Sequence, residues 1–234
     1  MTWFKSLPLF VQLLGFSVAT MYLPMLFAIR LEDWDVARTL FYYTTFLLII
    51  IALIGIAVTG YASQNSARHY LLTVFGALLV VPSLLAIPFD YLVPSINYFQ
   101  AYFEMLSSLT TTGATLFDDP SIVPAALHMM RAILGWVGGF FILVVALSIF
   151  APLHIGGFEV FAAFQDGQKG GSQIVNADAS QRLTRYASQI FPVYLFVTVF
   201  LIVALLIAGD RTLVAVSHAM SIISTSGISP VGGL

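Results

Sequence analysis

The chain has 234 residues, of which 59% are hydrophobic and 9% are charged, and its mean hydropathy is +0.96. This composition lies far outside the range of soluble domains and indicates an integral membrane protein. The net charge of -2 with scattered Lys and Arg argues against a nucleic-acid partner, and the lack of cysteine excludes disulfides, thiolate metal sites and cysteine nucleophiles.

Five apolar segments are long enough to cross a bilayer, whose hydrocarbon core is about 30 Å thick and needs about 20 helical residues. The first is too long for the apolar part of a secretory signal peptide, so we interpret it as a span. The sequence therefore predicts an all-α membrane protein. The expected spans are 7–29, 40–61, 70–92, 132–153 and 190–208.

The charged residues between these spans indicate how the chain is oriented. Segment 30–38 is net acidic, whereas the basic residues fall on the other side of the predicted membrane. The positive-inside rule then places the N-terminus in the cytoplasm. The glycine-rich polar segment 154–185 would also be cytoplasmic, either as a flexible linker, which its composition favours, or as a docking surface. The basic residues in question are Lys5, Arg68, Lys169, Arg182 and Arg185.

Two further segments, 97–109 and 210–223, are helical in pattern but too short to cross. The first has 13 residues, and a helix of that length reaches only about 20 Å at 1.5 Å per residue. Each should enter the membrane and stop partway. The polar backbone that follows is tolerated at such depth only when it is buried in protein or lines a water-filled cavity. Both segments are therefore predicted to be re-entrant helices.

The loops after these two helices share one pattern. Residues 107–115 read SSLTTTGAT and residues 221–229 read SIISTSGIS, at an offset of 114 residues. We predict two copies of one unit, which consists of a span, a re-entrant helix, a loop and a returning span, with the second copy cut short. At this offset Ala101, Ser107, Thr111 and Gly113 match Ala215, Ser221, Thr225 and Gly227.

The predicted organisation divides the chain into four parts. Residues 1–67 hold two leading spans, and residues 68–153 form the first pore unit. Residues 154–185 form the cytoplasmic segment, and residues 186–234 form the incomplete second unit.

Both loops carry the oxygen atoms that a cation filter requires. A monovalent cation must exchange its water oxygens for protein oxygens, and stacked backbone carbonyls supply them. Gly113 and Gly227 permit positive φ, which turns successive carbonyls toward one axis, and the C-terminal ends of the re-entrant helices add partial negative charge. An ordinary polar loop is the alternative for one copy alone, but repetition favours a filter. Further oxygens, or bracing of the loops, can come from Thr110, Thr111, Thr112, Ser224, Thr225 and Ser226.

Several charged residues accompany the loops. Glu104 and His218 occupy equivalent positions on the two short helices; each can titrate at an ion site, or can bond to backbone behind the loop and support the filter, which we favour. Arg131 can snorkel to the outer interface, which we favour, or pair with Glu104 or Asp118. The outer carboxylates either raise the local cation concentration or are ordinary solvated groups; they are Asp90, Asp118, Asp119 and Asp210.

Other motifs give no sign of catalysis. The small residues of segment 135–139, GWVGG, favour close helix packing, and we assign them no ligand role. The sequence has no zinc pair of the H-E-x-x-H type, no G-x-S-x-G nucleophile and no phosphate-binding G-x-x-x-x-G-K, and its four histidines are far apart. We expect neither an enzyme nor a covalently bound cofactor.

Together these motifs resemble the Trk/Ktr/HKT superfamily of potassium transporters, specifically its TrkH branch. The resemblance rests on residues 103–115 (FEMLSSLTTTGAT), 135–139 (GWVGG) and 154–158 (HIGGF), and on the two leading helices. It implies four repeated units around one filter, in which Gly113 and Gly227 are the first two filter glycines. Loops 110–114 and 224–228, including Ala114 and Ile228, would form two of the four walls. Glycine at position 113 favours potassium over sodium, and K+ is expected at Thr111, Thr112, Gly113, Thr225, Ser226 and Gly227.

The resemblance also implies surroundings and partners. A family member would lie in lipid of the cell (inner) membrane, form a homodimer and bind a cytosolic nucleotide-sensing RCK-type subunit, TrkA-like, whose contact can include segment 154–185. The chain departs from the family because it lacks the end of the second unit and the third and fourth units. Three explanations are open. The chain is part of a transporter, which we favour; or it is a split subunit that pairs with a second half; or it is a short variant whose copies share one filter. Potassium uptake, passive or ion-coupled, is the expected function, and a non-conducting membrane protein that modulates a full-length transporter is the alternative.

Overall fold

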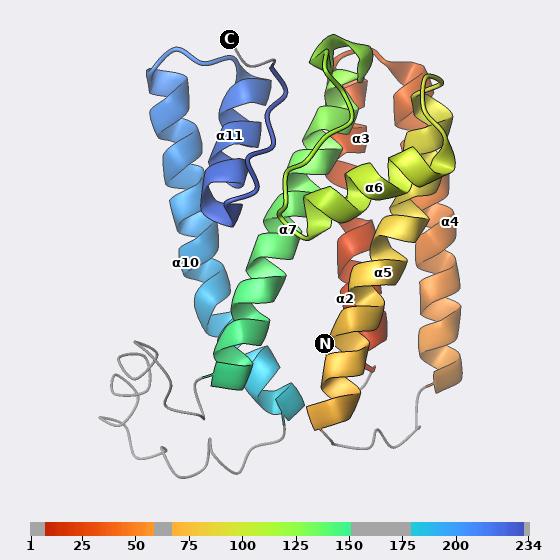
Figure 1. The fold of residues 1–234 in the computed structure, drawn as a ribbon, viewed down its shortest axis with the longest axis vertical. Helices are drawn as coiled ribbons and strands as arrows, with labels where there is room; N and C mark the ends of the chain where they lie inside the picture. Colours follow the sequence, from red (N-terminus) through yellow and green to blue (C-terminus); the bar gives the residue numbers. More distant parts are fainter. Residues whose placement is uncertain (1–7, 59–66, 151–178, 232–234) are drawn as a thin grey trace.

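A computed structural model describes residues 8–58, 67–150 and 179–231, and regular structure in these ranges is entirely helical (Figure 1). The all-α prediction is confirmed. The predictions that concern Lys5, Lys169 and most of segment 154–185 fall outside these residues. The helices are α2 (Leu9–Ala19), α3 (Tyr22–Arg30), α4 (Trp34–Val58), α5 (Ala67–Leu92), α6 (Tyr98–Leu109), a 3-10 turn (Pro120–Ile122), α7 (Ala125–Phe150), α10 (Ala179–Ile207) and α11 (Thr212–Ser224).

Each predicted span corresponds to a helical stretch that is long and apolar enough to cross a membrane. Within the described residues there are five such stretches, so the chain is a multi-pass membrane protein. Four of the helices begin earlier than predicted, because the predicted spans leave out turns that contain charged or polar residues. Helix α4 begins at Trp34 rather than at residue 40, and α7 begins at Ala125 rather than at residue 132. Helix α5 begins at Ala67 rather than at residue 70, and α10 begins at Ala179 rather than at residue 190.

The first span is not the single continuous helix that the sequence predicts. Helices α2 and α3 are separated by a turn at Thr20 and Met21. Thr20 donates a hydrogen bond from Oγ1 to the Ser17 carbonyl at 2.7 Å, and the Met21 backbone N–H donates to Val18 at 3.0 Å. These local bonds satisfy backbone and hydroxyl groups at the break, as an apolar surrounding requires.

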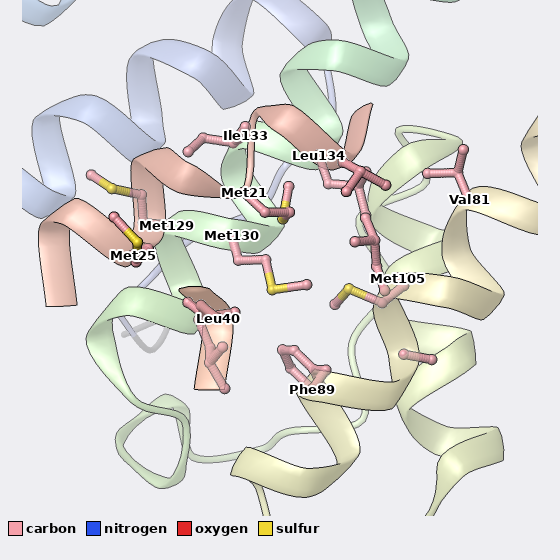
Figure 2. Close-up of a cluster of buried hydrophobic side chains, with 14 of the residues drawn as sticks. Met21, Met25, Leu40, Val81, Phe89, Met105, Met129, Met130, Ile133 and Leu134 are labelled. Carbon is pink, nitrogen blue, oxygen red and sulfur yellow. The ribbon is translucent and has the colours of Figure 1, made fainter. Parts of the chain in front are cut away.

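Helix α7 is the centre of the fold. Its spanning window is 72% buried, against 22% for α4 and 11% for α10. Figure 1 shows α7 between the α10 and α11 pair and the other helices. Methionine fills much of the space around it, because its flexible thioether adapts to irregular gaps. Figure 2 shows Met21, Met105, Met130 and Phe89 gathered there, and all four are buried.

Helices α6 and α11 are the two short helices predicted to be re-entrant. They have 12 and 13 residues, and both end part of the way along α7 (Figure 1). Helix α6 starts with a capping box, in which the Asn97 side chain accepts from the Gln100 N–H at 3.1 Å and the Gln100 side chain accepts from the Asn97 N–H at 2.9 Å. Such a box fixes the first turn of the helix. The C-terminal end of each helix leads directly into its polar loop.

Candidate functional site

The two polar loops lie against each other. A β-carbon placed on Gly113 would overlap the carbonyl oxygen of Ser226, although the two residues are far apart in the sequence. The backbones of the two loops therefore meet at Gly113, where no side chain could be accommodated.

The two loops also share an unusual backbone conformation. Gly113 and Gly227 have φ of 71° and 68°, and Thr111 and Thr225 have φ of 56° and 57°. Positive φ suits glycine but is a strained state for a β-branched residue such as threonine. Each loop therefore holds two residues at positive φ with the same spacing, Thr111 and Gly113 in the first loop and Thr225 and Gly227 in the second.

Backbone hydrogen bonds recur in the two loops at the sequence offset of 114. The Thr112 N–H donates to the Ser107 carbonyl at 2.9 Å, and the Ser226 N–H donates to the Ser221 carbonyl at 3.0 Å. Both bonds tie a loop back to the last turn of its helix. The same loop geometry is therefore built twice.

The hydroxyl groups of the two loops also make matching hydrogen bonds. Thr110 Oγ1 and Ser224 Oγ each donate to the carbonyl four residues earlier, at 2.8 Å in both loops. Thr110 Oγ1 lies 2.9 Å from Thr112 Oγ1, and Ser224 Oγ lies 3.1 Å from Ser226 Oγ. These side chains are engaged in bracing the loops.

The two loops differ in exposure. Thr110, Thr112 and Ala114 are exposed, whereas Ser226 and Ile228 are buried. The first loop presents an open surface, and the second is seated on α7 with Thr225 and Gly227 left exposed.

The GWVGG segment of α7 receives the ends of both short helices. A β-carbon on Gly138 would overlap the Leu109 carbonyl at the end of α6, and one on Gly139 would lie 2.7 Å from Ser224 Cβ at the end of α11. The prediction that this segment allows close packing is confirmed. The sequence does not predict which residues pack there. They are the last residues of α6 and α11, immediately before the two loops.

Glu104 and Arg131 form a buried ion pair behind the first loop. Arg131 Nη2 lies 2.8 Å from Glu104 Oε2, and their side chains are 4% and 0% exposed. The Glu104 carboxylate also accepts from the Leu116 N–H at 2.5 Å and from Thr115 Oγ1 at 3.0 Å. The guanidinium stands over the Phe117 ring, 5.9 Å from its centroid. The carboxylate thereby ties α6 and α7 to the chain that leaves the first loop.

The expectation that Arg131 snorkels to the interface is wrong. Helix α7 begins at Ala125, which places Arg131 well over one turn inside the helix, and the side chain turns to the Glu104 carboxylate instead. In an apolar surrounding a paired charge costs much less than an isolated one. The pairing with Glu104, which the sequence left as the second possibility, is the arrangement found.

His218 stands at the equivalent place behind the second loop. Its Nε2 lies 3.1 Å from Ser229 Oγ, which matches the contact of Glu104 with Thr115 at the same offset. Ser229 Oγ also donates to the Val231 carbonyl at 2.9 Å. The counterpart of Leu116 is Pro230, which has no N–H to offer. Among the described residues, His218 therefore makes fewer bonds to the chain after its loop than Glu104 does.

The acidic residues near the loops remain at the surface. Asp119 accepts hydrogen bonds from the Ser121 backbone N–H at 2.9 Å and from Ser121 Oγ at 2.8 Å. These bonds hold the pKa of the exposed Asp119 carboxyl below its usual range, so the group is charged at neutral pH. Asp118 is also exposed.

Some residues of the site could not be found from the sequence. Trp136 donates from Nε1 to Thr198 Oγ1 at 2.9 Å, and Tyr194 donates from its hydroxyl to the Trp136 carbonyl at 3.0 Å. These reciprocal bonds join α7 to α10 beside Gly139. Trp136 is a packing residue, 8% exposed. No motif in the sequence indicates its partners on α10.

The described residues combine membrane-spanning helices with two short helices that end inside the fold, each followed by a polar loop. This arrangement defines a multi-pass membrane protein with irregular backbone enclosed by its helices. A family model described as TrkH, cation transport protein, matches residues 45–232. The chain belongs to this family, and the predicted resemblance is confirmed.

Named relatives agree with this assignment. The chain is 34% identical over 136 residues to the Trk system potassium uptake protein TrkH of Vibrio parahaemolyticus, which covers 58% of this chain and 27% of that protein. It is 31% identical over 151 residues to the TrkH of Escherichia coli K12, which covers 64% and 30%. These relatives are named as uptake proteins and not as enzymes.

A solved structure has the same fold. The crystal structure of the potassium transporter TrkH from Vibrio parahaemolyticus matches with a TM-score of 0.76 at 27% sequence identity. The match covers 98% of this chain and 45% of that one. The chain therefore spans less than half the length of the relatives it matches.

Proposed function

We propose that this chain forms part of a potassium-conducting pore, in which K+ passes beside loops 110–114 and 224–228. The observation that supports this most is the contact of the two loops at Gly113 and Ser226, combined with one backbone geometry built twice. A filter needs several equivalent walls of carbonyl oxygens around one axis. The ligands would be the carbonyls of Thr111, Thr112, Gly113, Thr225, Ser226 and Gly227.

In this proposal the groups behind the loops act as supports. Glu104 accepts bonds from the chain that leaves the first loop, and His218 contacts Ser229 after the second. Neither residue needs to bind the ion. Each instead fixes the loop in the conformation that aims its carbonyls toward K+.

The wider organisation follows the same proposal. Residues 68–153 and 186–234 would be two pore units, 1–67 two leading spans and 154–185 a cytoplasmic segment. The chain would lie in the inner membrane with its N-terminus in the cytoplasm, and an RCK-type subunit similar to TrkA would bind on that side. Two loops enclose only part of a filter, so the other walls would come from further residues of a longer chain, from a second half or from a second copy.

Measuring potassium flux in liposomes tests this function. The protein is purified together with every chain that accompanies it, the intact masses are recorded, and K+ uptake is followed with Na+ as the comparison. We expect K+-selective flux that is absent from empty liposomes. If no flux is found although all co-purifying chains are present, the chain is not part of a conductor, and the alternative of a membrane protein that modulates a transporter takes its place.

Because the chain has no cysteine, a single introduced thiol reports on the path of the ion. Ala114→Cys replaces an exposed residue of the first loop by one of similar size. We expect a positively charged thiol reagent to block the flux of this variant. The control is Thr212→Cys, at the exposed start of α11, where the reagent should have no effect. Equal block of both variants, or of neither, would contradict the placement of the pore beside loop 110–114.

A further inference from the structure

Helix α4, in the second leading span, donates a hydrogen bond to α5 at a carbonyl that has no donor within α5. Helix α5 contains Pro88, and proline has no backbone N–H to donate to the carbonyl four residues earlier. That carbonyl belongs to Leu84. The Tyr43 hydroxyl of α4 donates to the Leu84 oxygen at 2.8 Å. Tyr43 thus takes the place of the donor that Pro88 lacks.

A second tyrosine bonds the neighbouring carbonyl of α5. The Tyr98 hydroxyl donates to the Ser83 carbonyl at 3.0 Å. Tyr98 is the first residue of α6, directly after the Asn97 cap. Two consecutive carbonyls of α5 are therefore bonded by tyrosines from different helices, one from a leading span and one from the start of the short helix that carries the first loop.

The bond from Tyr43 is a specific link and not a by-product of extensive packing. Helix α4 packs mainly against α2 and α3 and only lightly against α5, and 22% of its spanning window is buried. A polar hydroxyl on a helix of this kind needs a partner within the protein, and so does a carbonyl at membrane depth. Tyr43 and Leu84 satisfy each other.

We propose that Tyr43 is a positioning residue for the first loop. By bonding the carbonyl that Pro88 leaves free, it fixes the shape of α5 at the place where Tyr98 sets the start of α6. Helix α6 ends at Leu109, against Gly138 of α7 and immediately before loop 110–114. The leading span thus acts on the loop through α5 and α6. This inference rests on the proposed potassium function, and it gives the leading spans a part in ion selection.

The test is a cycle of four proteins: wild type, Tyr43→Phe, Pro88→Ala and the double variant. The K+ to Na+ permeability ratio is measured in liposomes from reversal potentials, and thermal unfolding is measured in detergent. We expect Tyr43→Phe to lower the ratio by about fivefold, the equivalent of one net hydrogen bond. In the Pro88→Ala background residue 88 regains an N–H for Leu84, so adding Tyr43→Phe should lower the ratio no further.

The control is Tyr42→Phe, which removes the same hydroxyl from the adjacent residue, whose side chain is 67% exposed; it should keep the wild-type ratio. An unchanged ratio in Tyr43→Phe, even with a lower unfolding temperature, would show that Tyr43 is only structural and would overturn the inference. Equal losses in both backgrounds would overturn it as well. Absence of potassium flux in the wild type would overturn the proposed function, and this inference with it, whereas flux with an unaltered ratio overturns this inference alone.

Discussion

Replacing Gly113 with alanine is expected to lower potassium flux by at least about a hundredfold. The φ of 71° places residue 113 in the left-handed region, where a β-carbon costs roughly 1–2 kcal/mol. The same β-carbon would overlap the Ser226 carbonyl. Because that oxygen belongs to backbone, no side-chain rotation relieves the overlap, and the facing loop must move. Each ~1.4 kcal/mol corresponds to about a tenfold change, so strain and displacement together account for the loss.

Variants of two other glycines distinguish the effect of backbone strain from the effect of the contact between the loops. Gly227 has φ of 68° but no atom within 4 Å of a β-carbon, so Gly227→Ala adds strain alone and should reduce flux by about tenfold or less. Gly209, at the end of α10, has φ of 100° and is equally open; Gly209→Ala should conduct nearly as well as wild type. Liposome flux of the three variants is the measurement. A Gly113→Ala protein that conducts like Gly209→Ala would contradict the contact between the loops.

Glu104→Gln is expected to destabilise the protein by about 3–5 kcal/mol, because removing one partner of a buried ion pair leaves the other charge uncompensated. The carboxylate is fully buried and Arg131 is nearly so. The loss should appear as a lower midpoint of thermal unfolding in detergent. Replacing both partners, as Glu104→Gln with Arg131→Met, should recover part of the stability since no charge is left unpaired.

The matched control is the surface pair of Arg38 and Asp35. Their atoms lie 2.6 Å apart, closer than those of the buried pair, but the side chains are 64% and 89% exposed. Exposed pairs contribute about 0–1 kcal/mol, so Arg38→Ala should change the midpoint little. If Glu104→Gln and Arg38→Ala had equal effects, the Glu104 pair would not be a structural support of the first loop.

The repeat of the loops could be read from the sequence, because it depends on local pattern. Identical spacing of Ser107, Thr111 and Gly113 with their counterparts specifies the same turn chemistry twice. Backbone bonds and φ values at the same offset have that local origin. The short lengths of α6 and α11 were also readable, since length alone decides whether a helix crosses a bilayer.

Contacts between elements that are distant in the sequence are harder to predict from the sequence. The sequence favours snorkelling of Arg131 because the predicted span begins only after this residue, since His128 and Arg131 interrupt an otherwise apolar stretch. Gly138 and Gly139 predict close helix packing, but nothing in the sequence identifies Leu109 and Ser224 as the residues that pack against them. The bond from Tyr43 to Leu84 likewise needs the relative placement of α4 and α5, which no periodicity encodes.

Anomalous diffraction from the protein crystallised with Tl+ in place of K+, together with every chain that co-purifies, locates the ion directly. We expect thallium density beside loops 110–114 and 224–228, within coordination distance of the carbonyl oxygens of Thr112, Gly113 and Ser226. Thallium density confined to other parts of a protein that still conducts would show that these two loops are not walls of the filter.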